Sequence, residues 1–341
     1  MQLCILAAYG VPRSKELSMA RSIIIDTDML GDDALAVLLP VVSPELDVKA
    51  ITCMAGRDPV ELITKNTLRV LRLADAWDIS VATGATKPLL AKAGTGLILG
   101  QKSLWNRLTR TVEGYMPEPE YEPYQCHAVE LILNLVNQHA NDIELVILGP
   151  LTNIAMCLIK DDEFANKVSR VIMMGGAIFV YGNSAPTAET NVYADPEAAR
   201  IVFQSGLPIT MVGLDVTTKV LMSMDHAQHV QTSRLPAVSS FISEITSSSL
   251  EAQRAIRKWI GFQMHDPLAM VVTFDTSLVT TERMLVDVET QGEISRGATV
   301  GDSREVWGKA PNVDVGRAKD DDHPRMFHFG ARSQKSLNIR D

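Results

Sequence analysis

The chain has 341 residues, of which 46% are hydrophobic. This content is enough to build a core, and it excludes a disordered or fibrous protein. Lys and Arg total 32 against 41 Asp and Glu, so the net charge is -9. An acidic protein repels phosphates, and nucleic acid is therefore not an expected partner. The four cysteines contain no CxxC pair, which indicates neither a disulfide framework nor a zinc site.

The two ends of the chain differ from its centre. The apolar run 3–11 is too short to cross a bilayer and lacks the basic residue that precedes a secretory signal. Residues 1–22 are predicted to be a disordered leader, residues 23–318 a single domain and residues 319–341 a charged C-terminal tail. No later apolar stretch reaches about 18 residues without a charge. No membrane contact is expected, and the predicted location is the cytoplasm.

The first elements alternate between strand and helix. The β-branched run Ile23-Ile24-Ile25 predicts a buried parallel strand, which ends in Asp26-Thr27-Asp28. The segment 32–39 opens on acidic residues that suit a helix N-terminus, and it stops near Pro40. A strand over 48–52, a helix over 59–76 and a strand over 79–82 follow. This alternation predicts a parallel sheet covered by helices.

Residues 92–125 lack periodicity and are rich in turn-forming residues, so they are predicted to be an irregular insertion. Regular alternation then resumes. The whole pattern predicts an α/β protein with three layers, in which a mostly parallel central sheet lies between helices on both faces. The later predicted elements are helices over 127–139, 153–158, 196–206 and 237–259, and strands over 143–148, 171–174 and 209–214.

Polar side chains gather where the predicted strands end. Ligands of open parallel sheets bind beyond the carboxyl ends of the strands, so a site is expected at this edge. The polar clusters are Asp26-Thr27-Asp28 with Asp32-Asp33, Leu148-Gly149-Pro150, Met174-Gly175-Gly176, Asn183 with Glu189 and Asn191, and His265-Asp266-Pro267.

The first cluster holds four aspartates, Asp26, Asp28, Asp32 and Asp33. Carboxylates this close repel one another unless a cation or shared protons offset their charge. Ligands that are all oxygen favour calcium or magnesium over zinc, and calcium accepts the higher coordination number. The cluster therefore predicts a hard divalent cation, with calcium as the first choice. The alternative is a helix N-terminus with solvated acids.

Taken together, these motifs resemble the nucleoside hydrolase family of inosine-uridine preferring nucleoside N-ribohydrolases, which use calcium to hydrolyse the N-glycosidic bond of ribonucleosides. The resemblance spans residues 23–318. It implies a Rossmann-like nucleoside hydrolase fold with the site at the C-terminal strand ends. The segments that carry it are Asp26-Thr27-Asp28 with Asp32-Asp33-Ala34, Gly149-Pro150-Leu151-Thr152-Asn153, Met174-Gly175-Gly176, Asn183 with Glu189-Thr190-Asn191, Asp195-Pro196-Glu197-Ala198-Ala199, and His265-Asp266-Pro267.

The resemblance also implies roles for individual residues. Asp28 would act as general base on the attacking water, and His265 would lie near the leaving base. The implied calcium ligands are the carboxylates of Asp28, Asp33 and Asp266 and the main-chain carbonyl of Leu148. The implied ribose contacts are Asp32, Met174, Asn183, Glu189 and Asn191. A ribonucleoside is the expected small-molecule partner, and a homodimer or homotetramer the expected assembly.

The chemistry of these residue types suits such a reaction. Calcium acidifies a bound water only modestly, so a carboxylate must also draw on its proton. The ribose becomes cationic as the glycosidic bond breaks, and surrounding carboxylates and amide oxygens stabilise that charge. Holding the 2′ and 3′ hydroxyls positions the sugar against the water, which also discriminates against deoxyribose.

The chain departs from the usual family pattern at several positions. Met29-Leu30 replaces a Pro-Gly pair, and Gly56-Arg57 replaces Gly-Asn, which exchanges a small amide for a long cation. A His-x-His-Gly segment common in the family reads Leu90-Ala91-Lys92-Ala93 here. One residue is inserted between Met174 and Asn183. The segment before His265 lacks the tyrosines of purine-processing members and carries Ser249, Gln253, Arg254, Arg257 and Trp259 instead.

Two other functions are compatible with parts of the pattern. A haloacid-dehalogenase-like phosphatase also begins with a strand and Asp-x-Asp, which would make Asp26 the nucleophile and Asp28 the acid. Leu30 occupies the position where that family has Thr or Val, and this disfavours it. The second alternative is a protein that binds nucleosides without turnover, because Arg57 and the missing histidines have abolished catalysis.

Overall fold

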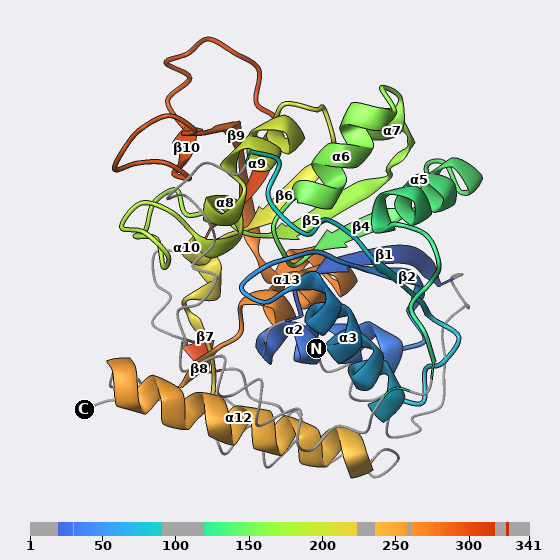
Figure 1. The fold of residues 1–341 in the computed structure, drawn as a ribbon. Coiled ribbons are helices and arrows are strands. Elements are labelled where there is room, and N and C mark those ends of the chain that lie inside the picture. The colour runs from blue at the N-terminus through green and yellow to red at the C-terminus, as the bar shows by residue number, and fades with distance from the viewer. Residues whose placement is uncertain are drawn as a thin grey trace.

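The computed structural model describes residues 20–29, 31–90, 119, 121–223, 236–257, 261–317 and 325–326. Within these ranges, nine strands form one sheet in the order β10-β9-β11-β6-β5-β4-β1-β2-β3 (Figure 1). The strands are β1 (Arg21–Thr27), β2 (Leu46–Cys53), β3 (Ser80–Thr83), β4 (Glu144–Ile147), β5 (Arg170–Met174), β6 (Ile209–Val212), β9 (Thr280–Val288), β10 (Thr299–Asp302) and β11 (Val313–Arg317).

The centre of this sheet is parallel. From β3 to β11 every neighbouring pair runs parallel, whereas β9 pairs antiparallel with both β11 and β10. The antiparallel edge was not predicted. β9 differs from the central strands because it is half exposed: Met284, Val286 and Val288 are buried, and the residues between them are not. The prediction of a mostly parallel sheet is confirmed.

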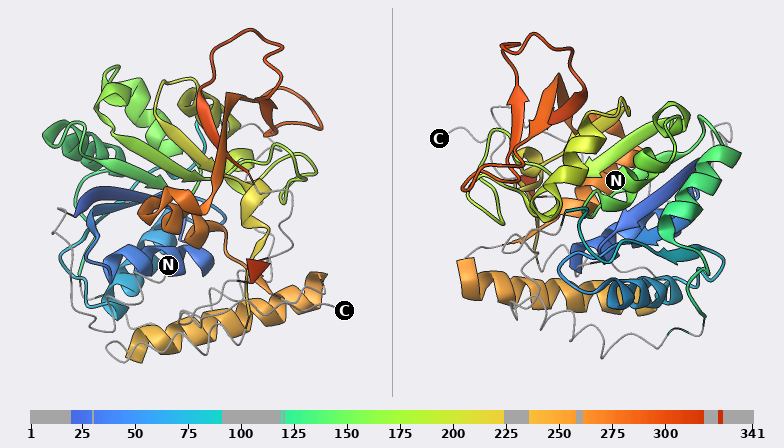
Figure 2. Two further views of the ribbon diagram at one scale, coloured as in Figure 1. Left: turned by 180° about the vertical axis from the view of Figure 1, so that it is seen from behind. Right: turned by 45° about the horizontal axis from the view of Figure 1, so that its top comes forward.

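Helices cover both faces of the sheet (Figures 1 and 2). The side chains of β1 show why its β-branched run suits this position: Ile23 and Ile25 join the core on one face, and Ile24 joins the core on the other. The predicted three-layer α/β architecture is therefore confirmed. One face carries α2 (Gly31–Val41), α3 (Val60–Leu73) and α13 (His265–Phe274); the other carries α5 (Ala128–Gln138), α6 (Thr152–Lys160) and α9 (Pro196–Phe203).

A smaller unit lies beside the helical layer formed by α2, α3 and α13. The strands β12, β7 and β8 form a second sheet, and α12 lies along α2 and α3 away from the main sheet (Figure 2). Val238, Phe241 and Ile245 of α12 share one core with α2, which anchors the helix. The elements are β7 (Val220–Met222), α12 (Pro236–Arg257), β8 (Phe262–Gln263) and β12 (Arg325–Met326), and the short helices elsewhere are α7 (Phe164–Lys167), α8 (Thr190–Ala194), α10 (Leu214–Thr217) and η1 (Thr276–Leu278).

The predicted domain boundaries fall mostly outside the described residues, and so do most of the predicted insertion and the C-terminal tail. At the N-terminal boundary, Arg21 and Ser22 already belong to β1. At the other end, β12 lies within the predicted tail and pairs with β7. Both observations extend regular structure beyond residues 23–318.

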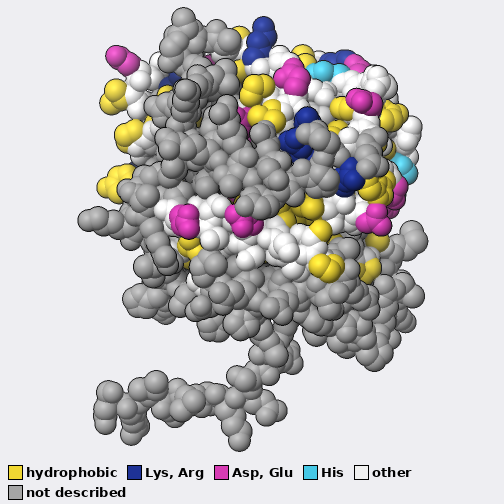
Figure 3. All heavy atoms as spheres, turned by 60° about the horizontal axis from the view of Figure 1, so that its bottom comes forward, with side chains coloured by type: hydrophobic (Ala, Val, Ile, Leu, Met, Phe, Trp, Pro, Cys, Tyr) yellow, Lys and Arg dark blue, Asp and Glu magenta, His cyan; other side chains and the backbone are white. Residues whose placement is uncertain are grey.

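The topology places the carboxyl end of β1 at a switch point. The chain leaves β1 toward β2 and β3 on one side, and it returns to β4 on the other side. In open α/β sheets this is where ligands bind. On the face shown in Figure 3, described acidic and basic side chains are scattered among apolar ones. None of the described helices is both long enough and apolar enough to cross a membrane.

Candidate active site

The loop from β1 to α2 brings three aspartates to the switch point. Asp28 and Asp33 are 2% and 1% exposed. The Thr27 hydroxyl donates a hydrogen bond to Asp33 Oδ1 at 2.5 Å and accepts one from the Met29 amide at 3.0 Å. Met29 itself has a left-handed backbone with φ 41°. The hydrogen bonds of Thr27 therefore fix Asp33 and the backbone of Met29 against the end of β1.

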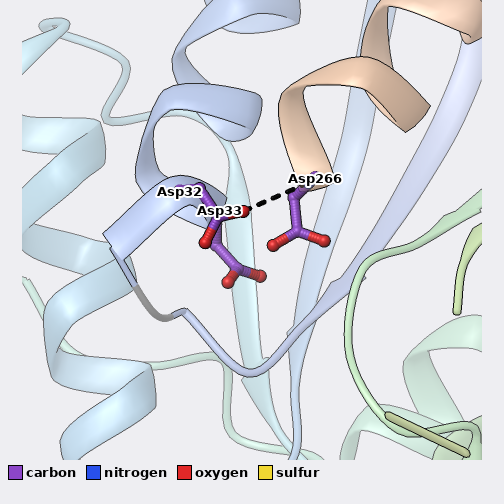
Figure 4. Close-up of side chains that lie close together, drawn as sticks. All are labelled: Asp32, Asp33 and Asp266. Carbon is purple, nitrogen blue, oxygen red and sulfur yellow. Dashed lines mark hydrogen bonds between the residues drawn. The ribbon is translucent and has the colours of Figure 1, made fainter. Parts of the chain in front are cut away.

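The N-terminus of α13 meets the N-terminus of α2 at this loop. The amides of His265 and Asp266 donate to Asp32 Oδ2 at 3.2 and 3.3 Å, so a residue of α2 caps α13. Carboxylate oxygens of Asp32, Asp33 and Asp266 all lie within 4.8 Å of one another (Figure 4). Segments more than 230 positions apart thus build one acidic cluster.

The cluster has the properties of a metal site. Asp266 Oδ1 is buried and has no hydrogen-bond partner. Burial raises the pKa of Asp266 well above its ordinary value, and the charges of Asp33, Asp32 and Asp28 raise it further. A buried carboxylate oxygen without a donor is unfavourable unless a cation binds it. The donor set is entirely oxygen, which fits a hard divalent metal.

Asp28 lies against the chain beyond β2 and β4. A Cβ atom at Gly56 would lie 1.9 Å from Asp28 Oδ2, and one at Gly149 would lie 2.9 Å from the Asp28 amide nitrogen. Both positions therefore require glycine for close approach. Burial raises the pKa of Asp28 well above its ordinary value, as do Asp33, Asp32 and Glu189, whereas Arg57 lowers it. The charges of Asp33 and Asp32 act on Asp28, but Asp28 is not one of the three aspartates whose carboxylate oxygens lie within 4.8 Å of one another.

Asn191 connects the predicted metal side of the site, which includes the carbonyl of Leu148, to the predicted sugar side, which includes Met174. Its amide nitrogen donates to the carbonyl of Leu148 at 2.7 Å and to the carbonyl of Met174 at 3.2 Å, and it lies 3.6 Å from Met174 Sδ. A carbonyl oxygen has two lone pairs, so Leu148 can accept this bond and still face a cation. The structure thus brings together three residues that the resemblance assigned to metal and ribose.

Glu189 and Asn183 complete this side. Glu189 accepts hydrogen bonds from the amides of Gly176, Asn191 and Val192, and burial raises its pKa. Asn183 Oδ1 accepts from the amide and the hydroxyl of Thr190, each at 3.0 Å. The inserted residue therefore leaves Asn183 beside the Glu189 to Asn191 segment. Their contacts with ribose remain predictions.

His265 begins α13 and is partly buried. Its Nδ1 lies 2.7 Å from the hydroxyl of Thr217, which fixes the orientation of the ring. No sequence motif indicated Thr217, because the pairing joins two helices that are far apart in the chain, α10 and α13. The assignment of His265 to the leaving base remains a prediction.

Asp26 has a structural environment of its own. It is 1% exposed, and its Oδ1 accepts from the hydroxyl of Thr52 at 2.6 Å and from the amide of Asn153 at 2.8 Å. Asn153 also bonds the carbonyl of Cys53 and the amide of Ala85. This network ties the ends of β1, β2 and α6 together. Such burial is incompatible with the nucleophile that the phosphatase alternative requires at Asp26.

We expect Asp26→Asn to stabilise the metal-free protein at pH 8 by a few degrees in melting temperature. Burial raises the pKa of Asp26 to about 6 from 3.8, while Oδ2 has no partner. The folded state therefore binds the proton more tightly than the unfolded state, and stability falls as pH rises from about 4 through 6. The ionised form destabilises by roughly 2 to 3 kcal/mol at most.

Thermal melts of the metal-free protein in the presence of a chelator, from pH 4 to pH 8, check this expectation. The difference between Asp26→Asn and wild type should vanish near pH 4. As a control, Asp26→Ala removes the acceptor of Thr52 and Asn153, so it should melt below wild type throughout. A pH-independent difference for Asp26→Asn would contradict the argument.

Comparison with known proteins agrees with this geometry. Residues 23–328 match the family model described as inosine-uridine preferring nucleoside hydrolase. The chain belongs to this family. A pyrimidine-specific ribonucleoside hydrolase RihA from Escherichia coli O8 (strain IAI1) is 40% identical over 304 residues, which cover 87% of this chain and 93% of that one. The predicted family and the predicted enzyme class, a nucleoside N-ribohydrolase, are confirmed.

Solved structures of nucleoside hydrolases share the fold. A plant nucleoside hydrolase, PpNRh1, superposes with a TM-score of 0.77 at 32% identity, covering 88% of this chain and 95% of that one. A purine-preferring ribonucleoside hydrolase from Gardnerella vaginalis gives 0.78 at 28% identity, covering 88% and 94%. The predicted nucleoside hydrolase fold is therefore confirmed, and the phosphatase alternative is set aside.

Proposed function

We propose that this nucleoside hydrolase binds calcium between Asp28, Asp33, Asp266 and the carbonyl of Leu148, and that it cleaves pyrimidine ribonucleosides. The observation that carries the metal proposal is the buried, unpartnered Oδ1 of Asp266 within the aspartate cluster. Asp32 also belongs to that cluster, because one of its carboxylate oxygens lies within 4.8 Å of those of Asp33 and Asp266. Asp32 Oδ2 already accepts hydrogen bonds from the first amides of α13. This supports placing Asp32 next to the cation but not among its principal ligands.

In the reaction, the oxygen of water bonds to C1′ of the ribose while the bond from C1′ to the base nitrogen breaks and leaves its electron pair on the base. Asp28 accepts a proton from the water and must be ionised to do so. A bound calcium ion would supply positive charge that keeps the buried carboxylates ionised and holds the water and the ribose hydroxyls. His265 precedes Asp266 at the start of α13, and we place it facing the departing base.

The ribose side of the site favours a cationic sugar. Glu189 is held by three backbone amides, so its carboxylate is fixed before the substrate arrives. We place Asp32, Asn183, Glu189, Asn191 and Met174 around the ribose. The side-chain oxygens of the four polar residues stabilise the positive charge that develops as the bond breaks, and Met174 packs against the sugar. Contacts with the 2′ hydroxyl disfavour deoxyribose.

The preference for pyrimidines is supported by the relative at 40% identity, which is named as pyrimidine-specific. The purine-preferring enzyme from Gardnerella vaginalis is less similar, at 28%. A homodimer or homotetramer is also proposed from the family resemblance, as is a cytoplasmic location, and both remain predictions.

A panel of ribonucleosides tests the proposed function directly. Uridine, cytidine, inosine and 2′-deoxyuridine are incubated with protein in calcium, and free ribose or deoxyribose is measured. We expect uridine and cytidine to be cleaved fastest, 2′-deoxyuridine to be cleaved at least about a hundredfold more slowly, and chelation to stop all release.

Other outcomes discriminate among the alternatives. Calcium binding without turnover of any nucleoside would favour the binding protein over the enzyme. Faster cleavage of inosine than of the pyrimidines would contradict the proposed base preference while leaving the metal proposal intact. Release that persists after chelation would contradict the role of calcium.

A further inference from the structure

Arg57 lies where the metal side and the sugar side of the site meet. It follows Gly56, whose Cα passes so close to Asp28 that a side chain there would overlap the carboxylate. Arg57 is partly buried, and its guanidinium donates to the hydroxyl of Thr190 at 3.3 Å. Thr190 stands between Glu189 and Asn191 and is itself bonded to Asn183. One side chain thus spans from the Asp28 loop to the ribose segment.

The positive charge of Arg57 acts on carboxylates of both the metal side and the sugar side of the site. It attracts Asp28 and Glu189, two carboxylates that are 2% and 1% exposed and that repel each other. A guanidinium keeps its charge at every pH at which enzymes work, so this attraction is permanent. In a buried setting such a charge is felt strongly, because little water screens it. A calcium ion in the aspartate cluster would be repelled by the same charge.

We propose that Arg57 is a resident counter-cation that weakens calcium binding. This inference rests on the proposed calcium function. In the metal-free protein Arg57 offsets part of the repulsion among the buried carboxylates. When calcium is present, the two cations share that negative charge, so the affinity for calcium is lower than four clustered carboxylates alone would give.

Calorimetric titration of calcium into metal-stripped full-length protein tests the proposal. Arg57→Gln and Arg57→Asn remove the charge and keep a polar side chain; Arg57→Lys keeps the charge. Arg283→Gln is the matched control, because it removes the same charge from a side chain that is 53% exposed and paired with Asp314. Folding of each variant is verified by circular dichroism and by its melting temperature in chelator.

We expect Arg57→Gln and Arg57→Asn to bind calcium at least about tenfold more tightly than wild type. Arg57→Lys and Arg283→Gln should stay within about threefold of wild type. The neutral variants should also melt lower in chelator and gain more from added calcium, because they have lost the internal cation.

The outcomes separate this inference from the proposed function. Calcium binding by wild type with unchanged or weaker binding by both neutral variants overturns the role of Arg57 and leaves the calcium site standing. Calcium binding that is undetectable in wild type and measurable in Arg57→Gln supports the role of Arg57. If neither the wild type nor any variant binds calcium detectably, both proposals are overturned.

Discussion

Asp28→Asn should lower kcat for uridine hydrolysis by about 10²-fold to 10⁴-fold, the range for loss of a general base. The expectation depends on the position of Asp28 in the structure. Asp28 is 2% exposed, its carboxylate lies beside Gly56, and the charges of Asp33, Asp32 and Glu189 act on it. An amide of the same shape fits this space and accepts no proton from water. Turnover is therefore lost without loss of the fold.

Steady-state kinetics at saturating calcium and uridine measures the effect on kcat, and the melting temperature verifies folding. Asp47→Asn is a suitable control, because Asp47 is 46% exposed and pairs with Lys49 at the surface. It should retain wild-type kcat. If Asp28→Asn stayed within about threefold of wild-type kcat, the proton would have to pass to another group, and Asp28 would be a ligand only.

The sequence predicted the centre of the fold because buried parallel strands have an unambiguous signal. Ile23, Ile24 and Ile25 face helices on both sides, so all three had to be apolar. The antiparallel edge was missed, although the buried Met284, Val286 and Val288 alternate with partly buried residues as in a half-buried strand. The second sheet has strands of two or three residues, which are too short for any periodicity.

The sequence predicted which residues form the site better than it predicted the hydrogen bonds that join them. The order of the motifs singled out the aspartates, Glu189 and Asn191, and their proximity follows from the shared carboxyl edge of the strands. The capping of α13 by Asp32, the bond between Thr217 and His265, and the network of Asn153 and Asp26 join residues that are far apart in the chain. Local patterns carry no information about such pairs, because they arise from tertiary packing.

Asp266→Asn should separate stability from metal binding. In metal-free wild type, Asp266 Oδ1 is buried without a donor, and Asp33, Asp32 and Asp28 surround the group with like charge. Asparagine removes one buried charge, and its amide can donate to the neighbouring carboxylate of Asp33. Because ionised carboxylates in such a cluster destabilise the folded state, the variant should melt higher than wild type in chelator.

Added calcium should reverse this order. Wild type should gain roughly 2.7 kcal/mol when free calcium is a hundredfold above its Kd, which raises its melting temperature by several degrees. Asp266→Asn lacks a charged ligand and should gain little at the same concentration. The exposed Asp162 provides the control: Asp162→Asn should follow wild type with and without calcium.

Thermal melts with chelator and with calcium therefore give a crossing pattern that a purely structural role would not produce. If Asp266 only stabilised the N-terminus of α13 or packed in the core, its replacement would lower the melting temperature in both conditions by the same amount. If the variant instead kept the full calcium response, the cation would bind elsewhere, and the cluster of Asp32, Asp33 and Asp266 would be a proton-sharing group. The same buried oxygen that destabilises the metal-free protein is thus expected to be the one that makes it able to hold the metal.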